Sequence, residues 1–313
     1  MIKRPKIGVL MGGPSAEHEV SLASGEQVLK HLDNKKYLPV PVKISKAGQW
    51  FLNGRVAHYL DVFKKIDVAF LALHGEFGED GKIQGLLDFH GVKYTGSRAV
   101  ASALAMDKLR SRKLFNLAGL TTPKTWFIPK DSLADAKIAF PVMVKPRSCG
   151  SSVGMMPVDN KKELQKALRL ARKFDEDVLV EEYLKGVEVT CGVLEDFNGK
   201  KHFALPVTEI IPLRESFFNY KSKYTTGASD EITPARISAK ETKKVQKAAI
   251  KAHQLLGCAG YSRSDFILVK DRAYLLELNT LPGMTKTSLL PQGAAVAGLT
   301  FPNLLDIIIK SSL

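Results

Sequence analysis

Glu277 and Asn279 stand two positions apart in an apolar run, YLLELN (274–279), that ends shortly before Pro282-Gly283. Residues two apart on a β-strand project from the same face, so this carboxylate and this amide should point together. Burying such a pair without a partner is costly. The run therefore predicts a strand whose polar side chains meet an ion or another charged group.

A third oxygen-bearing side chain comes from the preceding apolar run. Asp265 lies in a predicted strand that a short turn at 270–272 joins to the strand of Glu277 as a hairpin. A suitable register brings Asp265, Glu277 and Asn279 onto one face. Three hard oxygen donors suit Mg²⁺, which is usually completed by substrate phosphates and water. Pairing with nearby Lys or Arg side chains explains the same spacing equally well.

The composition is that of a soluble globular protein. The chain has 313 residues, of which 45% are hydrophobic, so it can bury a sizeable core in two or three structural units. No apolar run approaches the roughly 20 residues needed to cross a bilayer. The charged N-terminal residues lead into a predicted strand rather than a signal-peptide core, so we expect a cytoplasmic protein.

The three cysteines are few, odd in number and without CxxC spacing. Cys149, Cys191 and Cys258 therefore indicate neither a disulfide framework nor a zinc site. We expect at least one free thiol.

The formal net charge of +14 is compatible with nucleic acid, an acidic membrane surface or an anionic small substrate as partner. Basic residues alternate with acidic ones in helix-like segments such as 161–166 and 240–244, and no aromatic-basic recognition motif occurs. This distribution favours solvated helix faces. A basic nucleic-acid-binding protein is the alternative from another class of function.

The first third of the chain predicts a small, mainly parallel open sheet with helices. The expected elements are a strand over 6–11, a glycine turn, a helix that Ser15 caps and that runs to about His31, strands over 37–44 and 66–73, and a helix over 82–90.

The rest of the chain predicts helices and mostly antiparallel strands, an α+β pattern. The expected elements are a helix over 97–118, strands over 121–128 and 140–145, a glycine loop at 147–154, a helix over 160–174, strands over 187–194 and 202–210, a helix over 238–256, the hairpin described above and closing helices. Asn198-Gly199 is a hairpin signal. The polar stretch 212–234 is too long for an ordinary connector and predicts a lid or a disordered segment.

Several short segments occur in an order that carries more information than any one of them. They are the opening segment, LHGEFGEDGKIQG (73–85), MDKL (106–109), VMVKP (142–146), GSSVG (150–154) and ELNTLPGMT (277–285). Together they resemble the D-alanine–D-alanine ligase family of the ATP-grasp superfamily, along nearly the whole chain. The resemblance implies a three-domain ATP-grasp fold of the α/β class. Its units would be 1–95, an N-terminal substrate domain; 96–182, a central nucleotide-clamping domain; and 183–313, a C-terminal domain with the metal site and a mobile loop.

The resemblance also implies a reaction. ATP would phosphorylate one D-alanine to an acyl phosphate, and the amine of a second D-alanine would displace phosphate, giving a dipeptide for peptidoglycan synthesis. Mg²⁺ or Mn²⁺, with two ions expected, would assist. A homodimer, without nucleic acid or membrane as partner, is expected. D-alanine–D-lactate ligation, or another ATP-grasp carboxylate–amine ligation, is the alternative.

Site residues follow from the resemblance position by position. The nucleotide ligands would be Lys108, Lys145, Glu181, Glu188 and Lys223, and the metal ligands Asp265, Glu277 and Asn279. Catalytic roles would fall to Glu17, which binds the first ammonium, to Arg263 and the Gly283 N–H, which face the developing oxyanion, and to Ser151 and Tyr224, which join Glu17 in a network. His74 and Ser288 would bind substrate. A hydrogen-bonded structural role for His74 and a helix cap for Ser288 are the alternatives.

Overall fold

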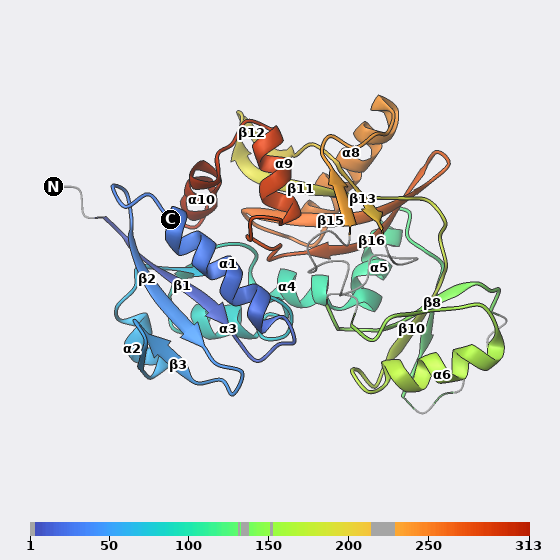
Figure 1. Cartoon of the computed structure of the whole chain (residues 1–313), viewed down its shortest axis with the longest axis horizontal. Helices are drawn as coiled ribbons and strands as arrows, with labels where there is room; N and C mark the ends of the chain where they lie inside the picture. The colour runs from blue at the N-terminus through green and yellow to red at the C-terminus, as the bar shows by residue number, and fades with distance from the viewer. Residues whose placement is uncertain (1–3, 131, 133–137, 151–152, 214–228) are drawn as a thin grey trace.

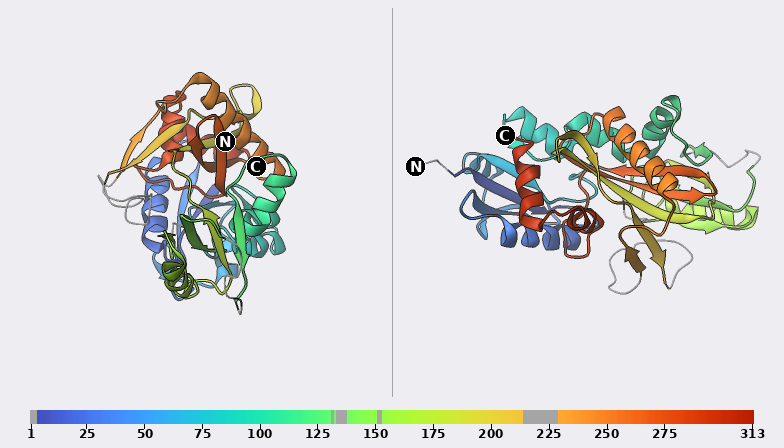
Figure 2. Two further views of the ribbon diagram at one scale, coloured as in Figure 1. Left: turned by 90° about the vertical axis from the view of Figure 1, so that its right-hand side faces the viewer. Right: turned by 90° about the horizontal axis from the view of Figure 1, so that it is seen from above.

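A computed structural model describes residues 4–130, 132, 138–150, 153–213 and 229–313 of the chain. Three β-sheets organise it, formed by three successive stretches of the sequence (Figure 1). The first and second sheets lie toward opposite ends of the long axis, and the third lies between them (Figure 2). The predicted α/β fold class is therefore confirmed.

The first sheet has the order β4-β3-β2-β1-β5-β6. β1 pairs in parallel with β2 and β5, and β5 pairs in parallel with β6, which confirms the mainly parallel sheet. The elements are β1 (Lys6–Gly12), α1 (His18–His31), β2 (Leu38–Ile44), β3 (Trp50–Leu52), β4 (Arg55–Val56), α2 (Tyr59–Phe63), β5 (Val68–Leu71), α3 (Lys82–Phe89) and β6 (Lys93–Tyr94).

The predicted cap of the first helix is wrong. Helix α1 has Glu17, not Ser15, at its N-cap. The Ser15 hydroxyl instead donates to the carbonyl oxygen of His74 at 2.7 Å and accepts from the Glu17 N–H at 3.0 Å. The Ser15 hydroxyl thus bonds to a distant segment instead of capping the helix, and Glu17 takes the N-cap position.

The second sheet is antiparallel, with the order β7-β10-β8-β9. Its strands are β7 (Thr125–Ile128), β8 (Val142–Pro146), β9 (Met156–Val158) and β10 (Val178–Glu182). Helix α6 (Lys161–Ala171) covers it and begins at Asn160, whose side chain accepts from the Glu163 N–H. Buried apolar side chains of α6 and of these strands form a separate small core.

The third sheet follows the order β14-β13-β11-β15-β16, and β12 pairs with β11. Its strands are β11 (Val187–Phe197), β12 (Lys200–Ala204), β13 (Thr208–Pro212), β14 (Ser229–Ile232), β15 (Tyr261–Val269) and β16 (Arg272–Asn279). Helix α8 (Ala239–Leu255) packs on it and starts with a capping box formed by Ser238 and Glu241. Helices α9 (Leu289–Val296) and α10 (Phe301–Lys310) close the chain.

Two predictions for this region differ from the structure. The single strand predicted over 202–210 is divided into β12 and β13, because Pro206 lacks the N–H that a ladder needs. The stretch 212–234 contains the short strand β14, which pairs with β13. The rest of the lid or disordered segment predicted over 212–234, residues 214–228, lies outside the described residues.

The hydrophobic cores group the chain differently from the sheets. The largest core joins the first sheet to buried side chains of α9 and α10. Helices α4 (Ala99–Met106) and α5 (Lys108–Leu117) contribute Ala105 and Phe115 to the core of the third sheet. The three sheets fall within the three ranges predicted as domains. The boundaries near 95 and 182 stay a prediction.

Within the described ranges, no single helix is long and apolar enough to cross a bilayer. Helices α9 and α10 reach that length and hydropathy only as a pair, and the pair is bent by 104°.

Candidate active site

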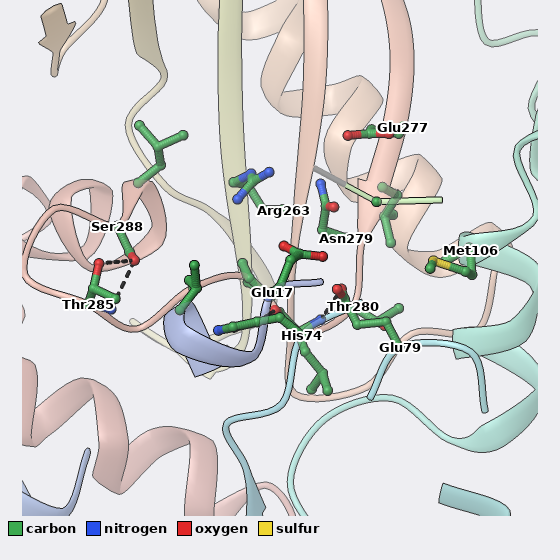
Figure 3. Close-up of a pocket in the computed structure, with 18 of the residues that line it drawn as sticks. Glu17, His74, Glu79, Met106, Arg263, Glu277, Asn279, Thr280, Thr285 and Ser288 are labelled. Carbon is green, nitrogen blue, oxygen red and sulfur yellow. Dashed lines mark hydrogen bonds between the residues drawn. The ribbon is translucent and has the colours of Figure 1, made fainter. Parts of the chain in front are cut away.

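Two cavities meet at Glu277, which lines both. One, of about 420 Å³, lies between the start of α1, the loop after β5 and the segment that follows β16. The other, of about 550 Å³, lies between the second and third sheets. Figure 3 shows a close-up of a pocket in which Arg263, Asn279 and Glu277 lie above Glu17 and His74.

The three predicted metal ligands come together at this junction. Asp265 pairs directly with Glu277 across the β15–β16 ladder, and the Asn279 amide donates to Asp265 Oδ2 at 3.2 Å. Arg263 donates to both oxygens of Asp265, at 2.9 and 2.8 Å, and Thr190 Oγ1 donates to one of them at 2.6 Å. Arg263 and Asp265, two positions apart on β15, thus share one face of the strand.

Basic side chains also pair with this cluster, as the alternative interpretation of the sequence expected. Lys108 Nζ lies 3.6 Å from Glu277 Oε2 and donates to the Cys149 carbonyl at 2.6 Å. The two interpretations are compatible, because each carboxylate oxygen has two lone pairs and can accept a hydrogen bond while it binds a cation. Two carboxylates and one amide oxygen within one hairpin fit a hard divalent ion.

A buried ion-pair cluster lies at the edge of the larger cavity. Lys145 Nζ is 2.6 Å from Glu181 Oε2, and Arg112 pairs with the other oxygen of the same carboxylate. Burial lowers the pKa of Lys145. Burial alone would raise the pKa of Glu181, but Arg112 and Lys145 lower it below its usual value, so this carboxylate is ionised. Two cations therefore hold the Glu181 carboxylate.

The larger cavity has the lining that a nucleotide needs. Lys145, Glu181, Glu188 and Asp265 line it together with the apolar side chains of Met143, Met155, Leu184, Val187, Ile210, Ile267 and Leu276. Apolar walls with a few polar groups at one edge are typical of small-molecule sites. The specific contacts of Glu181 and Glu188 with adenine and ribose stay a prediction.

His74 is tied into the wall of the smaller cavity through both ring nitrogens. Nδ1 donates to the Leu281 carbonyl at 3.0 Å, and Nε2 accepts from the Ser24 hydroxyl at 2.9 Å. The same Ser24 oxygen accepts from the Met284 N–H at 3.2 Å. Burial lowers the pKa of His74, so the ring is neutral near pH 7. These contacts favour the hydrogen-bonded role that was the alternative for this residue.

Glu79 holds the same segment after β16 from a second side. Its carboxylate accepts from the Gly75 N–H at 3.0 Å and from the Leu281 N–H at 3.1 Å. Burial and the nearby charge of Glu17 raise the pKa of Glu79 to about 7. Sequence reasoning did not single out this residue, although it lies in the glycine-rich segment 73–85.

Gly283 and Ser288 lie close together at the far edge of the smaller cavity. A Cβ on Gly283 would stand 2.6 Å from Ser288 Oγ, so the chain passes too close here for a larger residue. Ser288 is the N-cap residue of α9, but its side chain makes no cap bond. It accepts from the Thr285 N–H at 2.9 Å and lies 2.8 Å from Thr285 Oγ1 (Figure 3).

The remaining acidic groups frame the cavity. Glu17 lines it, and Glu231 of β14 lines it from the third sheet. Burial raises the pKa of Glu231, which accepts a hydrogen bond from Gln292. Glu231 was missed because its segment was predicted to be a loop. Ser151, Lys223 and Tyr224 lie outside the described residues.

Comparison with solved structures defines the class of protein. The chain resembles a D-alanine–D-alanine ligase from Bacillus anthracis complexed with ATP, at 34% identity and a TM-score of 0.82, over 98% of this chain and 97% of that one. It also resembles the VanG D-Ala:D-Ser ligase from Enterococcus faecalis, at 33% identity and a TM-score of 0.87, over 99% of this chain and 100% of that one. The fold is that of an ATP-grasp ligase.

Sequence comparison then gives the family. The family model for the D-ala D-ala ligase N-terminus matches residues 6–62 and 53–97. The family model for the D-ala D-ala ligase C-terminus matches residues 116–310. A D-alanine–D-alanine ligase from Syntrophobacter fumaroxidans is 46% identical over 98% of this chain and 97% of the relative. One from Leptospira interrogans is 41% identical over 98% of this chain and 99% of the relative. The chain belongs to the D-alanine–D-alanine ligase family, as its sequence motifs predicted.

Proposed function

We propose that this enzyme uses ATP to join two D-alanine molecules, giving D-alanyl-D-alanine, ADP and phosphate for peptidoglycan synthesis. The observation that carries the proposal is the position of Asp265, Glu277 and Asn279 where the two cavities meet. A phosphoryl group bound in the larger cavity can reach a carboxylate bound in the smaller one at this point.

The larger cavity takes ATP. Lys145 at its edge and Lys108 at the junction supply cations for the phosphates, and the apolar wall accepts the base. Mg²⁺ or Mn²⁺, with two ions expected, would be held by Asp265, Glu277 and Asn279 and would neutralise charge on the transferring phosphoryl group. Lys108, which contacts Glu277, is placed to exchange that contact for phosphate oxygens.

The smaller cavity takes the two amino acids. Glu17 receives the ammonium group of the first D-alanine at the start of α1. Ser288 and the N-terminus of the eight-residue helix α9 receive the carboxylate of the second D-alanine, since a helix N-terminus favours an anion. The substrate carboxylate to be activated then lies beside Arg263.

The reaction proceeds in two steps. A carboxylate oxygen of the first D-alanine attacks the γ-phosphorus of ATP, the bond to the bridging oxygen breaks, and ADP leaves. The unprotonated amine of the second D-alanine attacks the carbonyl carbon of the acyl phosphate, and phosphate leaves with the original carboxylate oxygen. Arg263 and the Gly283 N–H stabilise the oxyanion of the second step. Neutral His74 holds Leu281, two residues from Gly283, and so positions that donor.

Three further roles rest on the family resemblance alone. Lys223 binds ATP, and Ser151 and Tyr224 form a network with Glu17 that assists the attacking amine. Tyr224 would thereby favour an amine over the hydroxyl of D-lactate as acceptor. We further propose domains over 1–95, 96–182 and 183–313, a cytoplasmic homodimer, and neither nucleic acid nor membrane as partner.

An acceptor screen tests the proposed substrates. The chain is incubated with ATP, Mg²⁺ and D-alanine, alone or mixed with D-serine, D-lactate or L-alanine, and products are separated by mass. We expect D-alanyl-D-alanine as the main product with one ADP per dipeptide. A mixed product that exceeds D-alanyl-D-alanine at equal acceptor concentrations would contradict the assignment and favour the D-alanine–D-lactate or D-alanine–D-serine alternative. ATP-independent, strongly salt-dependent binding to DNA would point to the nucleic-acid alternative.

A further inference from the structure

Three side chains converge on the third sheet at a place that the proposed reaction does not use. Glu195 of β11, His202 of β12 and His253 of α8 each offer one ligand atom, and these atoms lie within 4.8 Å of one another. None of the three lines either cavity. The elements that carry them are neighbours near the top of Figure 1.

The distances within this cluster fit metal ligation better than hydrogen bonding. The Nε2 atoms of His202 and His253 each lie 3.4 Å from Glu195 Oε1. Strong hydrogen bonds between nitrogen and oxygen measure about 2.7–3.2 Å. Two ligand atoms that each lie about 2.0–2.1 Å from a tetrahedral zinc ion are separated by about 3.3 Å. The Glu195 oxygen is therefore spaced from each imidazole nitrogen as two ligands of one ion are, and all three atoms lie within 4.8 Å of one another.

The outer atom of each candidate ligand already has a partner. His253 Nδ1 lies 2.8 Å from Ser262 Oγ, and Glu195 Oε2 accepts from the Gly260 N–H at 2.7 Å. His202 Nδ1 lies 3.1 Å from the Gln254 side-chain nitrogen. Turning that amide about its last torsion presents its oxygen to an Nδ1–H group and leaves Nε2 to bind metal. Such outer contacts orient ligands in natural metal sites.

Burial and charge also favour a cation here. The His253 side chain is fully buried, whereas those of His202 and Glu195 are 16% and 18% exposed. Burial alone would raise the pKa of Glu195, but His253, the Gly260 N–H and His202 lower it, so the carboxylate is ionised near pH 7. The partly exposed side leaves room for water to complete the coordination.

We propose that Glu195, His202 and His253 form a site for a borderline transition-metal ion of the Zn²⁺ class, with water as the fourth ligand. Two imidazoles and one carboxylate are a known tetrahedral zinc set, and imidazole ligands disfavour Mg²⁺ and Ca²⁺. The ion would tie the β11–β12 hairpin to α8 and so stabilise the third sheet behind the ligase site.

Zinc binding to the full chain tests this site. The active-site acids are first altered as Glu277→Gln with Asn279→Ala, so that they do not compete, and the chain is freed of metal with a chelator. Calorimetric titration with Zn²⁺ should then show one ion per chain. Adding His202→Gln should weaken the affinity at least about 10-fold, whereas His58→Gln, at an exposed histidine elsewhere, should leave it unchanged. Equal affinity with and without His202, or no Zn²⁺ uptake by the folded chain, would overturn the proposal.

Two further readouts do not depend on calorimetry. Co²⁺ bound to the metal-free chain should give the intense visible absorption of a tetrahedral ion, and Zn²⁺ should abolish it. A weak octahedral spectrum would overturn the assigned geometry. Single His202→Gln should keep the ligase activity measured with Mg²⁺ within about two-fold of the parent, since the site lies outside both cavities. Loss of ligase activity in that variant would contradict a purely structural role for the ion.

Discussion

Asp265 connects the two chemical tasks of the site at the scale of single residues. Its carboxylate is a proposed metal ligand, and it also fixes the guanidinium of Arg263 through two hydrogen bonds. An arginine held as a planar fork by a carboxylate keeps its direction with little loss of entropy on binding. Asp265 would therefore both bind the proposed metal ion and position Arg263, the proposed donor to the oxyanion.

Altering two of the three proposed oxygen ligands should strongly lower phosphate release. Glu277→Gln combined with Asn279→Ala leaves only the Asp265 carboxylate in the proposed metal site. We expect turnover to fall by on the order of 10²-fold or more, because stabilisation of transferring charge is among the largest contributions to such reactions. Phosphate release with ATP, D-alanine and Mg²⁺ is the measurement, and Glu26→Gln, an exposed carboxylate on α1, is the control. Turnover within about two-fold of the parent would remove the metal-site claim.

Glu79 should make stability depend on pH in a defined direction. Its pKa is raised to about 7, so between about pH 4.5 and pH 7 the folded chain holds a proton that the unfolded chain has lost. The contribution of this group to the free energy of unfolding is therefore full below about pH 4.5 and lost as pH rises to about 7. Glu79→Gln stays neutral and should lack this dependence.

Urea unfolding of the parent and of Glu79→Gln, near pH 5 and near pH 8, measures the effect. The free energy of unfolding of the variant relative to the parent should be higher near pH 8 than near pH 5, by on the order of 2 kcal/mol. A lost hydrogen bond to Gly75 or Leu281 adds an offset that is the same at both pH values. Parallel changes in parent and variant would show that Glu79 titrates normally.

At the scale of elements, the site depends on how strands end. β1 stops at Gly12, which has a φ of +93°, and the following turn places Glu17 at the start of α1. The next residue, Gly13, donates its N–H to the Ile44 carbonyl at 2.8 Å. The backbone of this turn therefore packs closely against the end of β2. The turn determines the direction in which α1 begins.

Substituting Gly12 by alanine should disrupt this turn. A Cβ there would lie 2.2 Å from the Ile44 carbonyl oxygen, whereas at Gly48, with a φ of +80°, no atom lies within 4 Å. Both substitutions carry the cost of a positive φ, about 1–2 kcal/mol, but Gly12→Ala adds a backbone collision. We expect Gly12→Ala to lower the free energy of unfolding by roughly 2 kcal/mol more than Gly48→Ala in chemical denaturation. An equal loss in the free energy of unfolding for both variants would contradict this, because it would mean that the turn relaxes to avoid the collision with the Ile44 carbonyl.

Local signals in the sequence predicted many elements, and contacts between distant segments explain the errors. Asn160 and Ser238 cap α6 and α8 through bonds to residues three positions ahead, which a sequence can show. Ser15 has the same residue type but bonds to His74, 59 positions away. β14 was missed because it becomes a strand only by pairing with β13.

The same contrast between local signals and distant contacts holds for the residues of the candidate site. Asp265, Glu277 and Asn279 were predicted from alternation along two adjacent strands, and their register confirms that they meet. The bonds from His74 to the Leu281 carbonyl and from the Met284 N–H to Ser24 were not predicted, because they join residues 207 and 260 positions apart. A local sequence pattern cannot indicate such a contact, because the two segments meet only in the folded chain.

At the scale of the whole molecule, segments that follow the third sheet in the chain pack into the core of the first sheet, beside the smaller cavity. The core of the first sheet includes Leu281 and Met284 from the segment after β16, together with α9 and α10. Tyr37 donates to Asp306 of α10 at 2.6 Å and extends this attachment to the surface. The second sheet keeps a core of its own. The smaller cavity thus lies where the core of the first sheet, through Leu281, meets that of the third sheet, through Ala105 and Leu278. The larger cavity lies between the second and third sheets, whose cores are separate.

Transfer of oxygen from substrate to phosphate tests the central claim most directly. The chain is incubated with ATP, Mg²⁺ and D-alanine whose carboxyl oxygens are ¹⁸O, and the released phosphate is analysed by mass. An acyl-phosphate route predicts one ¹⁸O atom in the phosphate for each D-alanyl-D-alanine formed, because the bond broken by the amine joins carbon to the substrate's own oxygen. Dipeptide formed together with unlabelled phosphate would contradict this account of the reaction.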